Sequence, residues 1–107
     1  MDVFEALADP TRRQVVQLLG SRPHRAGELA EATGMSPPAL SRHLKVLLGS
    51  GIVTDARVAE DARVRVFHLR PESLVAVQAF LDQLGAEWRN QLRSFKRHVE
   101  GKPGWQR

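Results

Sequence analysis

Three polar side chains, Ser41, Arg42 and Lys45, lie close together near the middle of this chain. Hydroxyl, guanidinium and ammonium groups can donate hydrogen bonds to phosphate oxygens and to base edges. The stretch 36–48 that carries them reads as one helix, with Arg42 and Lys45 on its polar side and Ser41 at the edge. We therefore expect nucleic-acid recognition here. The apolar side of the same helix consists of Leu40, Leu44, Leu47 and Leu48.

Local signals place this helix directly after a shorter one. Ser36 can cap free backbone N–H groups, and Pro37 suits the first helical position. The preceding stretch, 26–33, reads as a short helix, and Gly34 supplies the left-handed residue that ends it. This layout is typical of a helix-turn-helix with a basic outer face, although an ordinary helical hairpin in a core has the same outline.

Two features of the second helix limit how it can read bases. Pro37 and Pro38 remove backbone donors at the end of the helix that usually enters a groove. Base reading then depends on the three polar residues named above. His43 borders the leucine side, where a structural hydrogen bond is favoured over a base contact.

A β-hairpin is expected after this helix. The stretches 52–58 and 63–69 are rich in valine and alternate loosely, as strands do, and an acidic loop connects them. Such a hairpin is a wing, whose Arg57, Arg63 and Arg65 can reach phosphates or a minor groove. The acidic loop argues against deep insertion, because like charges repel. The full set of expected DNA contacts is Ser36, Pro38, Ser41, Arg42, His43, Lys45, Arg57, Arg63 and Arg65.

Two helices are expected ahead of the helix-turn-helix. The first spans 2–8, and the second is capped by Asp9 and ends at Gly20, before a turn at 21–24. The Arg12–Arg13 pair lies in the first turn of this second helix, where the helix dipole disfavours positive charge. A phosphate contact, an acidic neighbour or ordinary surface exposure would each account for the pair.

The last long helix, 72–99, carries an apolar seam that one small domain cannot cover. Its large apolar residues recur in steps of three and four, the near-heptad spacing of helices that pack on each other. We expect the same helix of a second copy to pack on this seam, together with the first helix of the chain. Contact with the first helix alone is the intramolecular alternative. The expected interface consists of Phe4, Leu7, Leu81, Leu84, Trp88, Leu92 and Phe95.

Composition narrows the class of protein. The 107 residues carry a net charge of +4 and no cysteine, which excludes disulfides and thiolate chemistry. Basic charge concentrates in 36–70 and 86–107, as in a nucleic-acid-binding protein or on a solvated surface. No apolar run reaches the roughly 20 residues of a membrane span, and no signal-peptide pattern is present, so a cytoplasmic location is expected. No nucleophile motif, phosphate loop or carboxylate pair indicates an enzyme.

Five short phrases give nearly the whole chain a family resemblance. They are A-L-A-D-P-T-R-R at 6–13, G-E-L-A at 27–30, S-R-H-L-K-V-L at 41–47, S-G-I-V at 50–53 and R-V-F-H-L at 65–69. With them the chain resembles the ArsR-type family of bacterial repressors. The resemblance implies a mainly α winged helix-turn-helix with a β-hairpin wing, in the order α-α-α-α-β-β-α. It also implies a dimer that binds an inverted-repeat operator and releases it when an inducing ligand or metal binds.

The chain departs from the metal-sensing members of that family. Their thiolate site lies in the first helix of the helix-turn-helix, where this chain reads G-E-L-A-E-A-T. Their other site needs Asp and His two positions apart on the last helix. Here Leu84 lies two positions after Asp82, where the His would be, and Phe95 lies where a second His would be. Zinc usually needs three or four convergent ligands, so we expect no metal and no cofactor. The sequence resembles the metal-independent branch.

The expected molecule is one DNA-binding and dimerisation domain over 1–100, followed by a flexible tail at 101–107. Its expected function is that of a homodimeric repressor of its own or a neighbouring operon. Double-stranded operator DNA and a second copy are its expected partners, and no membrane is. The alternative is a winged-helix module that binds another protein and has no sequence-specific DNA binding. The sequence specifies neither the operator and the regulated genes nor whether a small-molecule inducer exists.

Overall fold

The helix-turn-helix has the predicted boundaries to within one residue. In the computed structural model, which describes residues 2–101, it consists of α3 (Ala26–Thr33) and α4 (Pro37–Gly49). Gly34 ends α3 with a φ of 71°, a left-handed conformation that glycine adopts without steric cost. The Ser36 hydroxyl accepts a hydrogen bond of 3.3 Å from a backbone N–H in the first turn of α4. Capping and turn chemistry therefore set these boundaries locally.

Two helices precede the helix-turn-helix, α1 (Val3–Leu7) and α2 (Pro10–Ser21). The Asp9 carboxylate accepts hydrogen bonds of 2.8 and 3.0 Å from two backbone N–H groups in the first turn of α2, as predicted for a cap. The prediction that Gly20 ends α2 is wrong by one residue. Gly20 has no positive φ, so it remains inside the helix, which continues to Ser21.

A three-stranded antiparallel sheet follows the order β1-β3-β2. The predicted hairpin is formed by β2 (Val53–Val58) and β3 (Asp61–Leu69). The sequence did not predict β1 (His24–Arg25), because 21–24 was interpreted as a turn. His24 pairs with Phe67 of β3 instead. Two residues are too few to show an alternating pattern, and only the pairing with a distant strand defines them.

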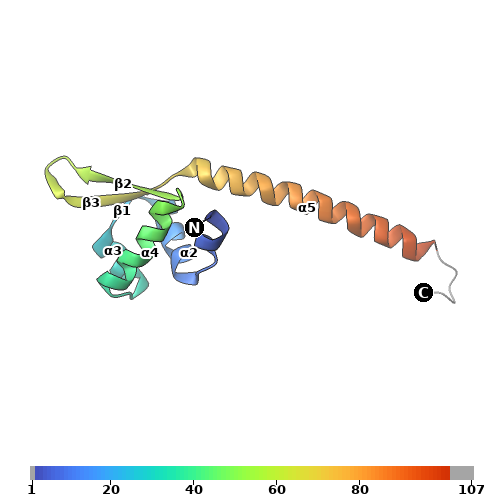
Figure 1. Ribbon diagram of the computed structural model, residues 1–107, viewed down its shortest axis with the longest axis horizontal. Coiled ribbons are helices and arrows are strands. Elements are labelled where there is room, and N and C mark those ends of the chain that lie inside the picture. Colours follow the sequence, from blue (N-terminus) through green and yellow to red (C-terminus); the bar gives the residue numbers. More distant parts are fainter. Residues whose placement is uncertain (1, 102–107) are drawn as a thin grey trace. The chain divides into compact units, whose positions relative to one another are not determined.

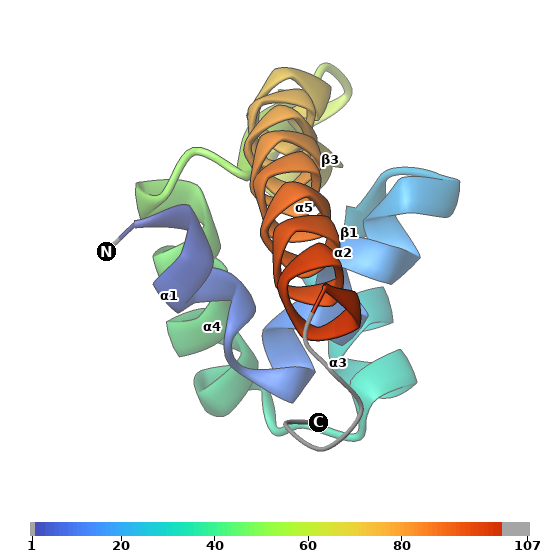
Figure 2. The same ribbon diagram turned by 90° about the vertical axis from the view of Figure 1, so that its right-hand side faces the viewer.

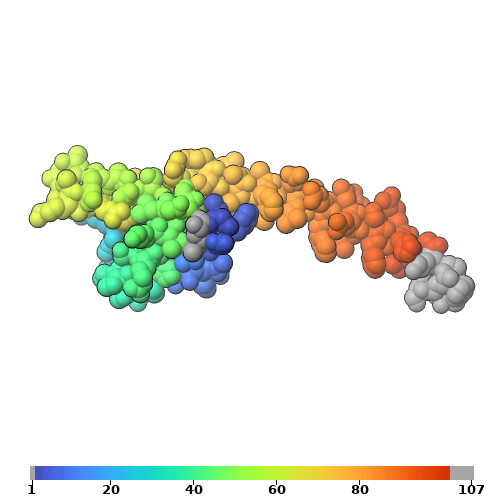
Figure 3. All heavy atoms as spheres, viewed as in Figure 1, coloured from blue at the N-terminus to red at the C-terminus, as the bar shows by residue number. Residues whose placement is uncertain are grey.

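The hairpin projects beyond the helices that lie beside it (Figures 1 and 3). Arg57 of β2 lies opposite Arg65 of β3, and the register then shifts, so that Val58 lies opposite Asp61. Such an irregularity bends the strand and increases its twist near the tip. The hairpin thus has the form of the predicted wing.

One apolar core joins the helices and the sheet up to β3. Within it α4 contributes three leucines, and α1 packs on α2, which follows it in the chain (Figure 2). Leu48, the fourth leucine of the predicted apolar side, is only half-buried. Each large side chain that leaves water stabilises the fold by about 1.5–3 kcal/mol. The core consists of Ala6, Val15, Leu19, Leu29, Leu40, Leu44, Leu47, Ile52, Val53 and Phe67.

The chain divides into two compact units, one ending at Leu74 and the other beginning at Val75. The second unit contains most of α5 (Pro71–Glu100), a continuous helix that extends the predicted 72–99 by one residue at each end. No residue of α5 is buried. Its large apolar side chains from Phe80 to Phe95 are 48% to 66% exposed. Leu74, Val77 and Val99, toward the two ends of the predicted seam, are half-buried.

Two further expectations concern the ends of this chain and membranes. Of the predicted tail 101–107, Gly101 forms a turn, and 102–107 lie outside the described residues. Among the helices of residues 2–101, none has the length and apolar character required to cross a membrane. The boundary predicted after residue 100 therefore stays a prediction.

Asp9→Ala should lower the free energy of unfolding by about 1 kcal/mol at neutral pH, because α2 loses its cap. Asp9→Asn should retain most of that stability, since an amide oxygen accepts the same hydrogen bonds. The hydrogen bond from the Arg12 backbone N–H holds the pKa of Asp9 below its usual 3.8. The stabilisation by the charged cap is therefore present above that value and is lost as the pH falls through the lower folded-state pKa.

Urea unfolding across a pH series measures this effect. Glu60→Ala serves as the control, because Glu60 is exposed at the tip of the hairpin. Equal losses of stability for Asp9→Ala and Glu60→Ala would contradict the capping role.

Candidate nucleic-acid interface

The polar side of α4 faces solvent because its apolar side is fixed in the core. Leu40, Leu44 and Leu47 are at most 4% exposed. With these three positions buried on one side, the helix cannot rotate about its axis without exposing a leucine. The residues of the predicted DNA-contact set that this leaves exposed on α4 and its cap are Ser36, Pro38, Ser41, Arg42 and Lys45.

Three cationic side chains of the predicted set have no internal partner. Within residues 2–101, the side chains of Arg42 and Lys45 on α4 and of Arg57 on β2 make no hydrogen bond and no ion pair. All three are exposed. They can approach phosphate oxygens or base edges without breaking a contact of the folded protein.

The other two wing arginines are paired with aspartates of the same hairpin. Arg63 donates from Nε and Nη2 to the two carboxylate oxygens of Asp61, at 3.1 and 3.2 Å. These hydrogen bonds hold the pKa of Asp61 below its usual range. Arg65 donates from Nε to Oδ2 of Asp55 at 2.7 Å. Each of these arginines is therefore partly neutralised before any DNA arrives.

His43 lies at the inner edge of α4 and is half-buried. Its Nδ1 is 3.3 Å from Nη1 of Arg12 and 3.9 Å from Oδ1 of Asp9. Because a guanidinium only donates, Nδ1 accepts in this contact, and the proton of the neutral ring is assigned to Nε2. The ring is thus engaged with α2 inside the protein, and a base contact by His43 stays a prediction.

The Arg12–Arg13 pair binds backbone carbonyls. Arg12 donates from Nε to the carbonyl oxygen of Ala6 at 2.6 Å and from Nη2 to that of Glu5 at 3.2 Å. Arg13 donates from Nη1 to two more carbonyls after them, at 3.0 and 2.9 Å. The pair therefore supplies donors to the carbonyls at the end of α1, one of which, that of Glu5, also accepts from the backbone N–H of Ala8. The residue types do not predict this role, because backbone acceptors leave no signal in the sequence. A five-residue helix just before two arginines is the available clue.

The histidines and carboxylates of residues 2–101 form no group of three or more that could hold a metal ion. His24 is buried, and its Nδ1 lies 2.8 Å from the carbonyl oxygen of Arg22. The ring nitrogen must donate in this contact, because a carbonyl only accepts.

The described surface offers positive charge and hydrogen-bond donors along α4 and the wing. This is the chemistry that binds nucleic acid.

Comparison with known proteins adds independent information. Residues 9–55 match the family model described as bacterial regulatory protein, arsR family. The chain is 36% identical over 97 residues to the HTH-type transcriptional regulator Rv2034 of Mycobacterium tuberculosis, a match that covers 91% of this chain and 85% of that protein. It is 39% identical over 56 residues to the transcriptional repressor SdpR of Bacillus subtilis, which covers 52% of this chain and 62% of that protein.

A solved structure extends the likeness to the whole fold. An ArsR-like transcriptional regulator from Rhodococcus sp. RHA1 superimposes with a TM-score of 0.77 at 29% sequence identity. The match covers 94% of this chain and 92% of that one. It therefore includes β3 and α5, which lie beyond the end of the family model at residue 55.

Arg57→Ala should weaken binding to duplex DNA on all sequences. It should also reduce the slope of log affinity against log salt by up to about 0.9, the value for one lost phosphate contact. Arg63→Ala should change the slope less, because Arg63 must first leave Asp61. Titration of a fluorescent duplex at several salt concentrations measures both slopes. A larger effect of Arg63→Ala than of Arg57→Ala would show that the internal ion pair does not decide which arginine contacts DNA.

Proposed function

We propose that the chain, which belongs to the ArsR family of bacterial regulatory proteins, is a homodimeric repressor. Membership of that family makes it a non-enzymatic, DNA-binding transcriptional regulator. It acts in the cytoplasm on an inverted-repeat operator of its own or a neighbouring operon. The outer face of α4 supports this function most directly. Cations without a partner among residues 2–101 lie there, on a helix whose rotation the core prevents. The similarity to a protein named a transcriptional repressor supports repression over activation.

We assign α4 to the major groove, with Arg42 as its main base-reading residue. Arg42 is exposed near the middle of the polar side and has no partner among the described residues, so its guanidinium can donate two hydrogen bonds to a guanine. Ser41 and Lys45 flank it. Pro38 lies in the first turn of the helix, where backbone donors are few, and contributes apolar contact only.

A second copy is proposed to cover the apolar seam of α5. Burial of large apolar side chains stabilises an assembly by about 1.5–3 kcal/mol for each one fully removed from water. Two identical seams that pack on each other form a twofold, isologous interface. Phe4 on α1 is 49% exposed and can extend that interface, whereas Leu7 is half-buried against its own core. The proposed interface residues of α5 are Leu81, Leu84, Trp88, Leu92 and Phe95.

Twofold symmetry gives the dimer its mode of DNA binding. Two copies of α4 about 34–36 Å apart would enter successive major grooves on one side of the duplex. Each wing would then lie over the backbone beside its half-site, where Arg57 meets phosphates. Dimerisation and tight operator binding are therefore expected to be lost together.

Metal is not proposed as the signal that releases DNA. The chain has no cysteine, and the described residues bring no three candidate ligands together. We therefore propose that the protein is one of the metal-independent members of its family. Regulation, where it exists, would then come from another class of ligand.

Arg42→Ala should lose about 1–3 kcal/mol of binding free energy on the preferred sequence and relax specificity at one base pair. The loss follows from removing a bidentate contact to a single base. Competition titrations with single-substituted duplexes measure it. A loss that is equal on every sequence would make Arg42 a phosphate contact instead.

Leu84→Glu should dissociate the dimer and abolish tight operator binding, because a charge would be buried at the centre of the interface. Sedimentation and duplex titration on the same samples measure the two losses. Ala86→Glu is the matched control, since Ala86 is exposed about halfway around α5 from Leu84. A monomeric wild type that still binds one full operator tightly would refute the dimer.

Zinc or nickel at micromolar concentration should leave operator affinity unchanged, because no ligand set is proposed for either ion. Titrations with and without a chelator provide the comparison. Stoichiometric release of DNA by either metal would overturn the assignment to the metal-independent branch.

A further inference from the structure

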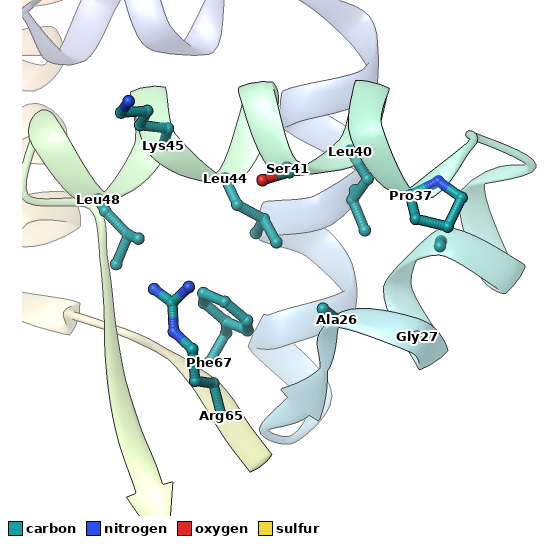
Figure 4. Close-up of a pocket in the computed structure, with 11 residues that line it drawn as sticks. Ala26, Gly27, Pro37, Leu40, Ser41, Leu44, Lys45, Leu48, Arg65 and Phe67 are labelled. Atoms are coloured by element: carbon teal, nitrogen blue, oxygen red, sulfur yellow. The ribbon is translucent and has the colours of Figure 1, made fainter. Parts of the chain in front are cut away.

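A hollow of about 370 Å³ lies between α3, α4 and β3, within the first unit of the chain (Figure 4). Its size corresponds to about twelve water molecules at about 30 Å³ each, which is at the small end of ligand pockets. Residues of the proposed DNA-binding surface border it, but no contact proposed above fills its interior. The residues that argue for a ligand are Leu40, Leu44, Leu48, Arg65 and Phe67.

The hollow has an apolar interior. In Figure 4 the side chains of Leu40, Leu44 and Leu48 extend from α4 toward the ring of Phe67 on β3. Leu40, Leu44 and Phe67 are each at most 4% exposed and form the floor of the hollow, whereas Leu48 is half-buried and remains accessible. A short aliphatic or aromatic body seated on this floor removes its own apolar surface from water, a transfer worth about 25 cal/mol for each Å². A DNA phosphate placed there would leave this apolar lining wet.

Arg65 supplies the polar end of the hollow. Its guanidinium lies 5.0 Å from the centroid of the Phe67 ring, and Asp55 holds only its Nε. The two terminal nitrogens make no hydrogen bond with the described residues, and the group points toward α4 (Figure 4). Two parallel N–H donors on one guanidinium match the two oxygens of a carboxylate.

The charge of the lining selects the sign of the ligand. None of the residues that line the hollow is acidic, and Lys45 at its border is a second cation. The ammonium end of Lys45 points away from the leucines in Figure 4, so Arg65 is the anchor. A cationic ligand would meet repulsion, and a neutral one would leave the terminal nitrogens of Arg65 unused.

We propose that the hollow binds a small monocarboxylate with a short apolar body, and that this ligand is an effector of DNA binding. The second part rests on the proposed function. Ser41 and Lys45, assigned above to the DNA-facing side of α4, also border the hollow, and Arg65 belongs to the predicted wing contacts. Asp55 already pairs with Arg65, so a bound carboxylate adds a second negative charge to the surface that DNA phosphates would approach. The ligand therefore lowers affinity for DNA.

Calorimetry of the full chain with octanoate tests the binding site without DNA. We expect stoichiometric binding by the wild type, and about tenfold or greater weakening in Arg65→Gln, which is about 1.4 kcal/mol or more. Arg63→Gln is the matched control, because Arg63 lies on the same strand, also pairs with an aspartate and does not line the hollow. It should bind octanoate as the wild type does. Octan-1-ol, with the same body and no charge, should bind at least tenfold more weakly (about 1.4 kcal/mol).

Equal weakening of octanoate binding in Arg65→Gln and Arg63→Gln would overturn the proposed carboxylate site. Equal binding of octanol and octanoate by the wild type would do the same. Circular dichroism of each variant establishes that it is folded. Absence of octanoate binding by folded wild-type protein would overturn it as well.

A duplex titration with octanoate present tests the effector role. Octanoate should weaken DNA binding by the wild type and by Arg63→Gln, but not by Arg65→Gln. Binding of octanoate without any change in DNA affinity would overturn the effector role. Failure to bind DNA when octanoate is absent would instead count against the proposed function, and the calorimetry would still decide whether the hollow is a site.

Discussion

Burial of the leucine side of α4 is the constraint on which the rest of the structure depends. Leu40, Leu44 and Leu47 pack into a core that also receives α1, α2, α3 and the sheet. Rotating α4 to turn another side outward would expose at least one of them, at a cost of about 1.5–3 kcal/mol. The same contacts that hold the fold together therefore decide which side chains of α4 can meet DNA. Stability and recognition thus depend on two sets of residues on opposite sides of one helix.

The positive charges of the first unit are divided between two tasks. Arg12 and Arg13 hold the end of α1 through its carbonyls, and Arg65 is held by Asp55. Within residues 2–101, the side chains of Arg42 and Arg57 make no hydrogen bond and no ion pair. A net charge of +4 does not show this division, because a paired arginine and an unpaired one count equally in it. Only the unpaired ones can neutralise phosphates without first losing a contact.

A structural feature could be predicted from the sequence when the interactions that produce it lie between residues that are close in the chain. The caps at Asp9 and Ser36 and the turn at Gly34 depend on neighbouring residues, and the structure confirms them. The strand β1 and the partners of Arg12 depend on groups distant in the chain or on backbone atoms, and periodicity does not reveal them. The apolar seam of α5 was predicted by its spacing. Its large apolar side chains from Phe80 to Phe95 are indeed exposed, and a second copy as the partner that covers them stays a prediction.

The central claim is that two copies of α4, related by a twofold axis, read one operator. Selection of bound duplexes from a random DNA pool by the full chain tests it most directly. The account predicts enrichment of an inverted repeat whose half-site centres are about 10 base pairs apart, or a multiple of that spacing. Enrichment of a single unrepeated site, or of no common sequence at all, would contradict it.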